Sequence, residues 1–459
     1  MTKPIPTIES TSRFLRIIRQ FNAILRPLNF IEERNRKYGD LYQVTFKNAP
    51  PTVMTSNPEA IEEIFTALPD TFVVAKGNEI LRFLVGDNSL LLKDGELHRK
   101  RRSLLMPPFH GKSLQECSDK LVSITKEVCD SWQENETFKV RPYMQEITLR
   151  VILNLVFGVD SGERYDKLEQ LLTTLLETFS NPLSAGLLFF PIMQKDWGKF
   201  SPWGRLLLLK EEIRKLVYAE IQERRAIINS GKYFGRDILN LLIVSVDRNG
   251  ERMTDAEIHD ELITLLFAGH ETTASSLTWL FYWIHYFPEV EEKLRFELES
   301  LGDKADYQAI NNLPYLDAVI SETLRIYPIA ANTFPRLLTK PVSVMGHQFE
   351  AETWLMISIY NLHHREDLYP NSKQFKPERF LEKTYNPFEY IPFGGGHRRC
   401  IGSALALLET KLVAATILSR FQLQLTSKRP MLPVRRGLTL APPASFKMVV
   451  NKKIEVNSF

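Results

Sequence analysis

One cysteine has the surroundings of a metal ligand. Cys400 lies in the segment Phe393-Gly-Gly-Gly-His-Arg-Arg-Cys-Ile-Gly402, directly before an apolar stretch with helical spacing that begins at Ser403. The positive end of a helix dipole and the guanidinium groups of Arg398 and Arg399 both favour the thiolate form. The glycines permit positive φ angles and leave room for a flat ligand. Because thiolates bind soft metals and iron, Cys400 is a candidate ligand; the alternative is a structural cysteine in a glycine-rich turn.

A second candidate site places an acid beside hydroxyl groups within a long helical pattern. The segment reads Ala268-Gly-His-Glu271-Thr272-Thr273. Burying an acid beside a hydroxyl is costly, which indicates a purpose. The Thr272 hydroxyl can donate to the carbonyl of Ala268 and loosen the helix, and such openings often occur at functional sites. The alternative is a Gly–Thr kink packed against a neighbouring helix.

Charged residues at helical spacing suggest two further clusters. His98 and Arg102 lie four residues apart, so they share a helix face and could grip a carboxylate or phosphate. Arg99, Lys100 and Arg101 between them are expected to form a solvated basic face. Elsewhere, an i, i+3 pair lies among apolar residues and is expected to be buried with a third charged partner. These three residues are Glu322, Arg325 and Arg379.

Together these segments resemble the cytochrome P450 family of haem-thiolate monooxygenases. Four signatures follow the family's order, and the resemblance covers about residues 30 to 450. They are Ala268–Thr273, Glu322–Arg325, Phe375–Phe380 and Phe393–Gly402. The resemblance implies haem b (iron protoporphyrin IX) as cofactor, with Cys400 as the iron ligand. Many family members have Trp where this chain has His98.

The resemblance also implies roles for particular residues. By family position, contacts to the haem fall on His98, Arg102, Ala268, Arg336, Phe393, Arg398, Cys400 and Gly402. Glu271 and Thr272 are implied as the catalytic pair that delivers protons for O–O bond cleavage. Glu322, Arg325 and Arg379 are implied to lock the core behind the cysteine loop, which is a structural role.

The implied reaction inserts one oxygen atom of O2 into a hydrophobic substrate and reduces the other to water. By family position, the substrate pocket draws on Phe72, Leu187, Phe190, Ala268, Ile329, Ala330, Thr333 and Leu438. These residues are largely apolar or small, so we expect a hydrophobic ligand: a fatty acid first, with a terpenoid or flat aromatic as alternatives. The competing functions are a haem-thiolate isomerase or peroxygenase, against which the Glu271–Thr272 pair argues, and a non-catalytic haem-binding protein.

The electrons for such a reaction must come from a separate protein. The sequence has no Gly-x-Gly-x-x-Gly fingerprint after a strand and no fused flavin or ferredoxin region. We therefore expect a ferredoxin-type donor with its reductase. The basic residues Arg99, Lys100, Arg101, Arg398 and Arg399 are the candidate docking face. The formal net charge of +3 does not indicate a nucleic-acid partner, and a monomer is expected.

These sites need a scaffold, and the sequence predicts a mainly α protein with small β-sheets. By resemblance this is the cytochrome P450 fold, in which a long central helix crosses over the haem. The longest helical pattern runs from Asp255 to Phe287, about 50 Å at 1.5 Å per residue. A capping box of Thr254 and Glu257 precedes it, and Pro288 ends it. Short strands are expected at 41–56, 341–359 and 422–450.

The 459 residues contain no linker-like break, so we expect one domain at 30–459 after an N-terminal extension at 1–29. An amphipathic stretch from Phe14 to Phe21 in that extension suits a peripheral helix that packs on the body; a membrane-surface contact or a transit peptide are the alternatives. No apolar run of 18 residues occurs, so no transmembrane anchor is expected. Three cysteines favour a reducing compartment, and hence the cytoplasm.

Overall fold

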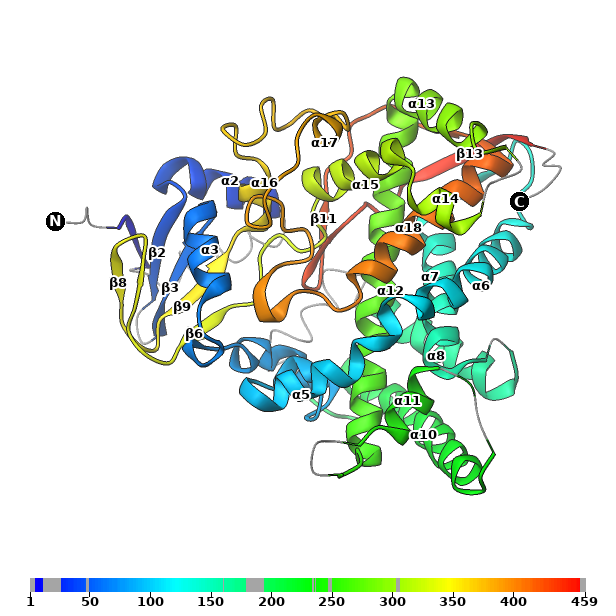
Figure 1. Ribbon diagram of the computed structural model, residues 1–459, viewed down its shortest axis with the longest axis horizontal. Coiled ribbons are helices and arrows are strands. Elements are labelled where there is room, and N and C mark those ends of the chain that lie inside the picture. Colours follow the sequence, from blue (N-terminus) through cyan, green and yellow to red (C-terminus); the bar gives the residue numbers. More distant parts are fainter. Residues whose placement is uncertain are drawn as a thin grey trace.

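The computed structural model describes residues 5–10, 26–46, 49–159, 161–178, 194–232, 235, 237–246, 250–302 and 306–454. The N-terminal amphipathic stretch and the substrate candidates Leu187 and Phe190 lie outside these residues. Helices predominate in the described part of the chain, and the sheets are small (Figure 1). The predicted fold class is therefore confirmed.

The helices are distributed along the whole described chain. They are α2 (Pro27–Tyr38), α3 (Pro58–Thr66), α4 (Arg82–Val85), α5 (Gly95–Leu105), α6 (Lys112–Cys129), α7 (Val140–Phe157), α8 (Glu163–Thr178), α10 (Pro202–Asn229), α11 (Ile238–Val244), α12 (Asp255–Tyr286), α13 (Pro288–Glu299), α14 (Tyr307–Asn311), α15 (Pro314–Ile326), α16 (Ile359–His363), α17 (Arg379–Glu382) and α18 (Ser403–Arg420).

Within the described residues, the strands form one larger sheet and three small ones. They are β1 (Thr7–Ser10), β2 (Leu41–Phe46), β3 (Ala49–Thr55), β4 (Phe72–Val73), β5 (Thr137–Lys139), β6 (Arg336–Leu338), β7 (Val342–Val344), β8 (His347–Phe349), β9 (Trp354–Ile357), β10 (Phe421–Leu425), β11 (Val434–Arg436), β12 (Thr439–Ala441) and β13 (Lys447–Lys453). The six-stranded sheet has the order β1-β2-β3-β9-β6-β4 and lies at the N-terminal side of the molecule (Figure 1). The others are β10-β13-β5, β11-β12 and β7-β8.

The central helix α12 crosses the molecule as the sequence predicts (Figure 1). Thr254 and Glu257 form the capping box, each accepting a backbone N–H of the other. The helix ends at Tyr286, one residue before the predicted end, and Pro288 begins α13. Its 32 residues span about 48 Å at 1.5 Å per residue.

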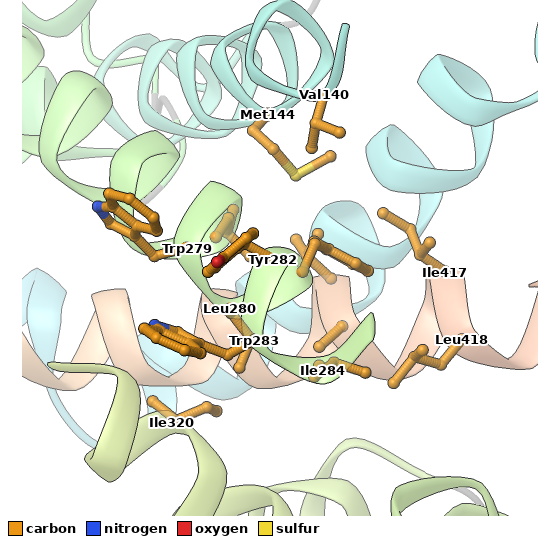
Figure 2. Close-up of a cluster of buried hydrophobic side chains, with 14 of the residues drawn as sticks. Val140, Met144, Trp279, Leu280, Tyr282, Trp283, Ile284, Ile320, Ile417 and Leu418 are labelled. Atoms are coloured by element: carbon orange, nitrogen blue, oxygen red, sulfur yellow. The ribbon is translucent and has the colours of Figure 1, made fainter. Parts of the chain in front are cut away.

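The second half of α12 lies in the largest hydrophobic core. Trp279, Leu280 and Tyr282 are at most 1% exposed. They pack among side chains from α7, α15 and α18, including Met144 and Ile320 (Figure 2). This packing fixes α12 relative to α18, the helix that follows the cysteine loop. Among the described residues, no helix is both apolar and long enough to cross a membrane.

Candidate functional site

The loop that ends at Cys400 is held by backbone hydrogen bonds. The Cys400 N–H donates to the Phe393 carbonyl at 3.0 Å. Gly394 and Gly396 adopt φ of +67° and +61°, conformations that favour glycine. Gly402, by contrast, has φ of −85° as the N-cap of α18, a conformation that does not require glycine. A Cβ added at Gly402 would meet no protein atom within 4 Å, which leaves this side of the backbone open.

Gly395 is required by packing instead of by its φ. Its backbone is extended, with φ of −159°. A Cβ at this position would lie 2.3 Å from the Phe65 ring of α3. Gly396 approaches the backbone of the same residue. Gly395 and Gly396 therefore allow the cysteine loop to pack closely against α3.

Part of the residue Cys400 is accessible to solvent, but protein atoms surround its thiol and raise the pKa of that thiol. Burial is the largest cause, and it outweighs three opposing influences: the Gly402 N–H and the guanidinium groups of Arg102 and Arg399. The helix start and Arg399 therefore act in the predicted direction, but desolvation outweighs them and the pKa of the free thiol is raised. Arg102, from α5, is a contributor that the local sequence did not indicate.

A cavity of about 320 Å³ opens beside this loop. Its walls come from the loop, α3, α5, β4 and β6. Six basic side chains line it: His98, Arg99, Arg102, Arg336, His397 and Arg398. Asp94 is the acidic residue in the lining, and it pairs with Arg398. The cavity is thus strongly cationic and suits an anionic ligand.

Burial and neighbouring positive charges disfavour the charged forms of the buried members of this cluster. Burial, followed by the proximity of Arg398, lowers the pKa of Arg336 to about 10. Burial, followed by Arg398, Arg102 and His397, lowers the pKa of His98 to about 3, so its imidazole is neutral near pH 7. A ligand with carboxylates would compensate these groups, because an opposite charge favours the charged form. The donor set therefore fits the two propionates of a haem held next to the cysteine loop.

Asp94 organises the wall of the cavity, a role that the sequence did not reveal. Its two carboxylate oxygens accept the backbone N–H groups of Val74 and Ala75, each at 2.9 Å. The same carboxylate pairs with Arg398 of the cysteine loop. Residue spacing could not indicate this ion pair, because Asp94 and Arg398 are 304 residues apart in the sequence.

The middle of α12 presents an open face. Ala268 is exposed and Thr272 half-buried, although most of the helix is buried. The Thr272 hydroxyl donates to the Ala268 carbonyl at 2.7 Å, which confirms that prediction. Gly269 serves packing instead, since a Cβ there would lie 3.1 Å from Ile152 of α7. The segment thus combines helix packing at Gly269 with an open face at Ala268 and Thr272.

Glu271 contacts α7, which sequence reasoning missed. Its carboxylate forms an ion pair with Arg141 and accepts a hydrogen bond from Gln145 Nε2 at 2.9 Å. The preceding residue, His270, is buried and lies 2.8 Å from the Thr148 hydroxyl. One pattern in the sequence could have indicated this contact. Arg141 and Gln145 are spaced i, i+4 in a largely apolar helical stretch, so they share a helix face.

The described substrate candidates lie in different settings. Phe72, in β4, lines the basic cavity. The Thr333 hydroxyl accepts from Arg336 Nη1 at 3.1 Å, so it holds a cavity residue in place. Ala330 is half-buried against a core cluster that includes Phe72.

The two remaining candidates are connected by a backbone contact. The Ile329 carbonyl accepts the Leu440 N–H at 2.8 Å. This bond joins the segment after α15 to the β11–β12 hairpin. Leu438, at 37% exposure, lies in the turn of that hairpin.

One expectation about the basic face is wrong. Arg101 is buried, where a solvated side chain was expected. It pairs with Glu257 at 2.6 Å and lies 3.7 Å from Glu261, both on α12. The reason is that this side of α5 packs toward the start of α12. Arg99, in contrast, is exposed.

The predicted charged triad is buried. Glu322 and Arg325 are 0% exposed, and Arg379 is 4% exposed. Arg325 Nε and Nη2 donate to the two Glu322 oxygens at 2.6 and 2.8 Å. Arg379 Nε donates to Glu322 at 3.1 Å. The i, i+3 pair and its third partner therefore meet as the sequence predicts.

Known proteins resemble this chain over most of its length. A family model described as cytochrome P450 matches residues 14–449. A protein of Mycobacterium tuberculosis named cytochrome P450 135B1 is 33% identical over 433 residues, which cover 94% of this chain and 89% of the relative. Cytochrome P450 138 of the same species is 30% identical over 423 residues, covering 91% and 90%.

Solved structures share the fold. The retinoic-acid-bound cyanobacterial CYP120A1 is 24% identical, with a TM-score of 0.81, and the match covers 94% of this chain and 95% of that chain. The cytochrome P450DA heme domain is 23% identical, with a TM-score of 0.84, and the match covers 99% and 98%.

Proposed function

Because the chain belongs to the cytochrome P450 family, whose members are generally monooxygenases with a haem cofactor, we propose that it is a haem b monooxygenase of hydrophobic substrates. The observation that carries the proposal is the position of the exposed residue Cys400, two residues after Arg398 in the loop that walls a cavity lined by six basic side chains. One thiol and a cationic pocket are what an iron porphyrin with two carboxylates needs. We further propose that residues 30–459 form a single domain.

When bound, the haem would activate O2, with the Cys400 thiolate donating electron density to the iron. Arg102, Arg336 and His98 would hold the propionates through charge-assisted or neutral hydrogen bonds. The Arg398 guanidinium forms an ion pair with Asp94. Arg398 belongs to the cysteine loop and lines the cavity, so it would connect that loop to the bound cofactor. On the open face of α12, the Thr272 hydroxyl and the Glu271 carboxylate would take up protons and pass them on. Ala268, without a bulky side chain, would leave space for substrate.

The substrate that we favour is a fatty acid. The candidates Phe72, Ala268, Ile329, Ala330 and Leu438 are apolar or small, which supports a hydrophobic ligand. We keep a terpenoid or a flat aromatic as the alternatives. The physiological electron donor that we favour is a ferredoxin with its reductase. We further propose that the protein is a monomer and acts in the cytoplasm.

We expect dodecanoic acid to shift the haem of the purified protein from low to high spin, as a bound apolar ligand displaces water. With a plant-type ferredoxin, its reductase, NADPH and ¹⁸O2, the hydroxylated product should carry one ¹⁸O atom. Limonene and naphthalene, run in parallel, test the terpenoid and aromatic alternatives. Product formed from H2O2 alone would identify a peroxygenase, and rearrangement without O2 an isomerase. Absence of NADPH consumption with all three compounds would indicate a non-catalytic protein.

The donor should dock on the cationic side of the loop and α5. Arg99 and Arg399 are exposed there, whereas buried Arg101 is removed from the proposed face. We expect Arg99→Glu to slow reduction by an acidic ferredoxin about tenfold at low salt, because steering by opposite charges is lost. Stopped-flow reduction at two salt concentrations measures this effect, with exposed Lys452→Glu on β13 as the matched control. An unchanged salt-dependent rate in Arg99→Glu, with normal haem content, would contradict the docking face.

A further inference from the structure

The β11–β12 hairpin carries an arginine that has no part in the roles proposed above. Arg436 is the last residue of β11, opposite Thr439 of β12 and two residues before Leu438 in the turn. The residue is half-buried, and its Nε is buried without a hydrogen-bond partner. Within the described parts of the chain, no side chain forms a hydrogen bond or an ion pair with this guanidinium.

The charges around Arg436 do not compensate it. Burial lowers the pKa of Arg436, and no carboxylate acts in the opposite direction. The charged group that it influences is another arginine: burial, followed by the positive charge of Arg436, lowers the pKa of Arg141 to about 9. The nearby carboxylate of Glu271 is already paired with Arg141. Because a partly buried cation without a counter-charge is costly, an anionic ligand would stabilise this arrangement.

The hairpin places Arg436 beside residues that are proposed to contact the substrate. Leu438, in the turn, is 37% exposed. The Leu440 N–H donates to the carbonyl of Ile329, another substrate candidate, at 2.8 Å, and β12 packs on α12. The substrate candidates are largely apolar or small, and such pockets use a few polar groups to orient the ligand. Arg436 is positioned to be one of these groups.

Resting on the proposed monooxygenase function, we propose that Arg436 determines substrate specificity by binding the carboxylate of a long-chain acid. The planar guanidinium presents N–H donors whose geometry matches the two oxygens of a carboxylate. The alkyl chain of the acid then lies along the apolar candidates toward the open face of α12. The alternative is a packing role, in which the apolar stem of Arg436 covers the hairpin. Such a role does not depend on the charge of the ligand.

The test compares dodecanoic acid with 1-dodecanol, which has the same chain length and no charge. Both ligands are titrated, below the concentrations at which they aggregate, into the wild-type holoenzyme and the variants Arg436→Gln and Arg436→Lys. The dissociation constants are measured by the spin-state shift of the haem and by isothermal titration calorimetry. Arg429→Gln is the matched control, because Arg429 is an exposed arginine on the segment that leads to the same hairpin. Thermal midpoints and haem content report on folding.

We expect the wild type to bind the acid about tenfold more tightly than the alcohol, because only the acid forms a charge-assisted pair with the guanidinium. Arg436→Gln should remove this preference by weakening the binding of the acid, while the affinity for the alcohol stays within about twofold. Arg436→Lys should keep part of the preference, since it retains the charge and loses the planar fork of donors. Arg429→Gln should resemble the wild type.

Three results would overturn the inference. The first is equal affinity of the wild type for the acid and the alcohol, and the second is an unchanged preference in Arg436→Gln. The third is an equal loss of affinity for both ligands, which would assign Arg436 the packing role. If Arg436→Gln does not fold, Arg436→Met, which keeps an apolar stem, replaces it with the same outcomes. Failure of the wild type to bind either ligand, limonene or naphthalene would instead overturn the proposed function, and the inference with it.

Discussion

Replacing Cys400 with serine is expected to abolish the absorption band at about 450 nm that the reduced, carbon-monoxide-treated protein should show, because that band requires a thiolate ligand. Serine is close in size to cysteine, and the backbone bond from residue 400 to the Phe393 carbonyl does not depend on the side chain. The loop should therefore keep its shape. The loss should be essentially complete, whereas other variants of the site should only lower the haem content.

The control for this experiment is the half-buried Cys117 of α6. Its thiol donates to the Leu114 carbonyl within its own helix, and burial raises its pKa to about 12. Cys117→Ser should keep the band at full height. Thermal midpoints of both variants show whether either has unfolded. Retention of the band in Cys400→Ser would exclude Cys400 as the iron ligand.

The sequence predicted features that depend on local spacing. The capping box at Thr254 and Glu257 defines the start of α12, and Pro288 defines its end, because caps and prolines act within one helical turn. The Thr272 hydroxyl bond back to Ala268 was predictable for the same reason. Each of these features is decided by residues no more than four positions apart.

Features that depend on distant segments were missed. Arg101 was expected in solvent, but its partner Glu257 lies 156 residues further along the chain. A helical pattern shows which residues share a face, and it does not show which helix that face will meet. The same limit hid the contact of α7 with Glu271 and the pairing of Asp94 with Arg398.

The net direction of the Cys400 pKa shift could not be predicted from the sequence for a related reason. Adjacent arginines and the helix start are visible in the sequence, whereas the desolvation that outweighs them comes from the folded surroundings. The charged triad was the exception among long-range features. Its position was predictable because Glu322 and Arg325 lie among apolar neighbours, and a buried pair needs further partners.

Replacing Glu322 with glutamine is expected to destabilise the protein by about 3–5 kcal/mol, because it leaves buried Arg325 and Arg379 without their counter-charge. Urea unfolding followed by circular dichroism measures the free energy of unfolding. The matched control is Glu79→Gln, which breaks the exposed i, i+3 pair with Arg82 and should change the stability little. An unchanged urea midpoint in Glu322→Gln would contradict the importance assigned to the triad.

The same substitution should also weaken haem retention, because the triad is connected to the cysteine loop through His363. Arg325 Nη1 donates to the His363 carbonyl at 2.7 Å. The His363 Nε2 accepts the Ile391 N–H at 3.0 Å, and the Ile391 carbonyl accepts the Gly394 N–H at 3.0 Å. Burial, followed by Arg325, lowers the pKa of His363 to about 3, so the imidazole stays neutral and can accept this bond. Transfer of haem to excess apomyoglobin should therefore be faster for Glu322→Gln than for Glu79→Gln, at urea concentrations where both variants remain folded. Equal transfer rates would show that the triad stabilises the protein without affecting how the cysteine loop retains haem.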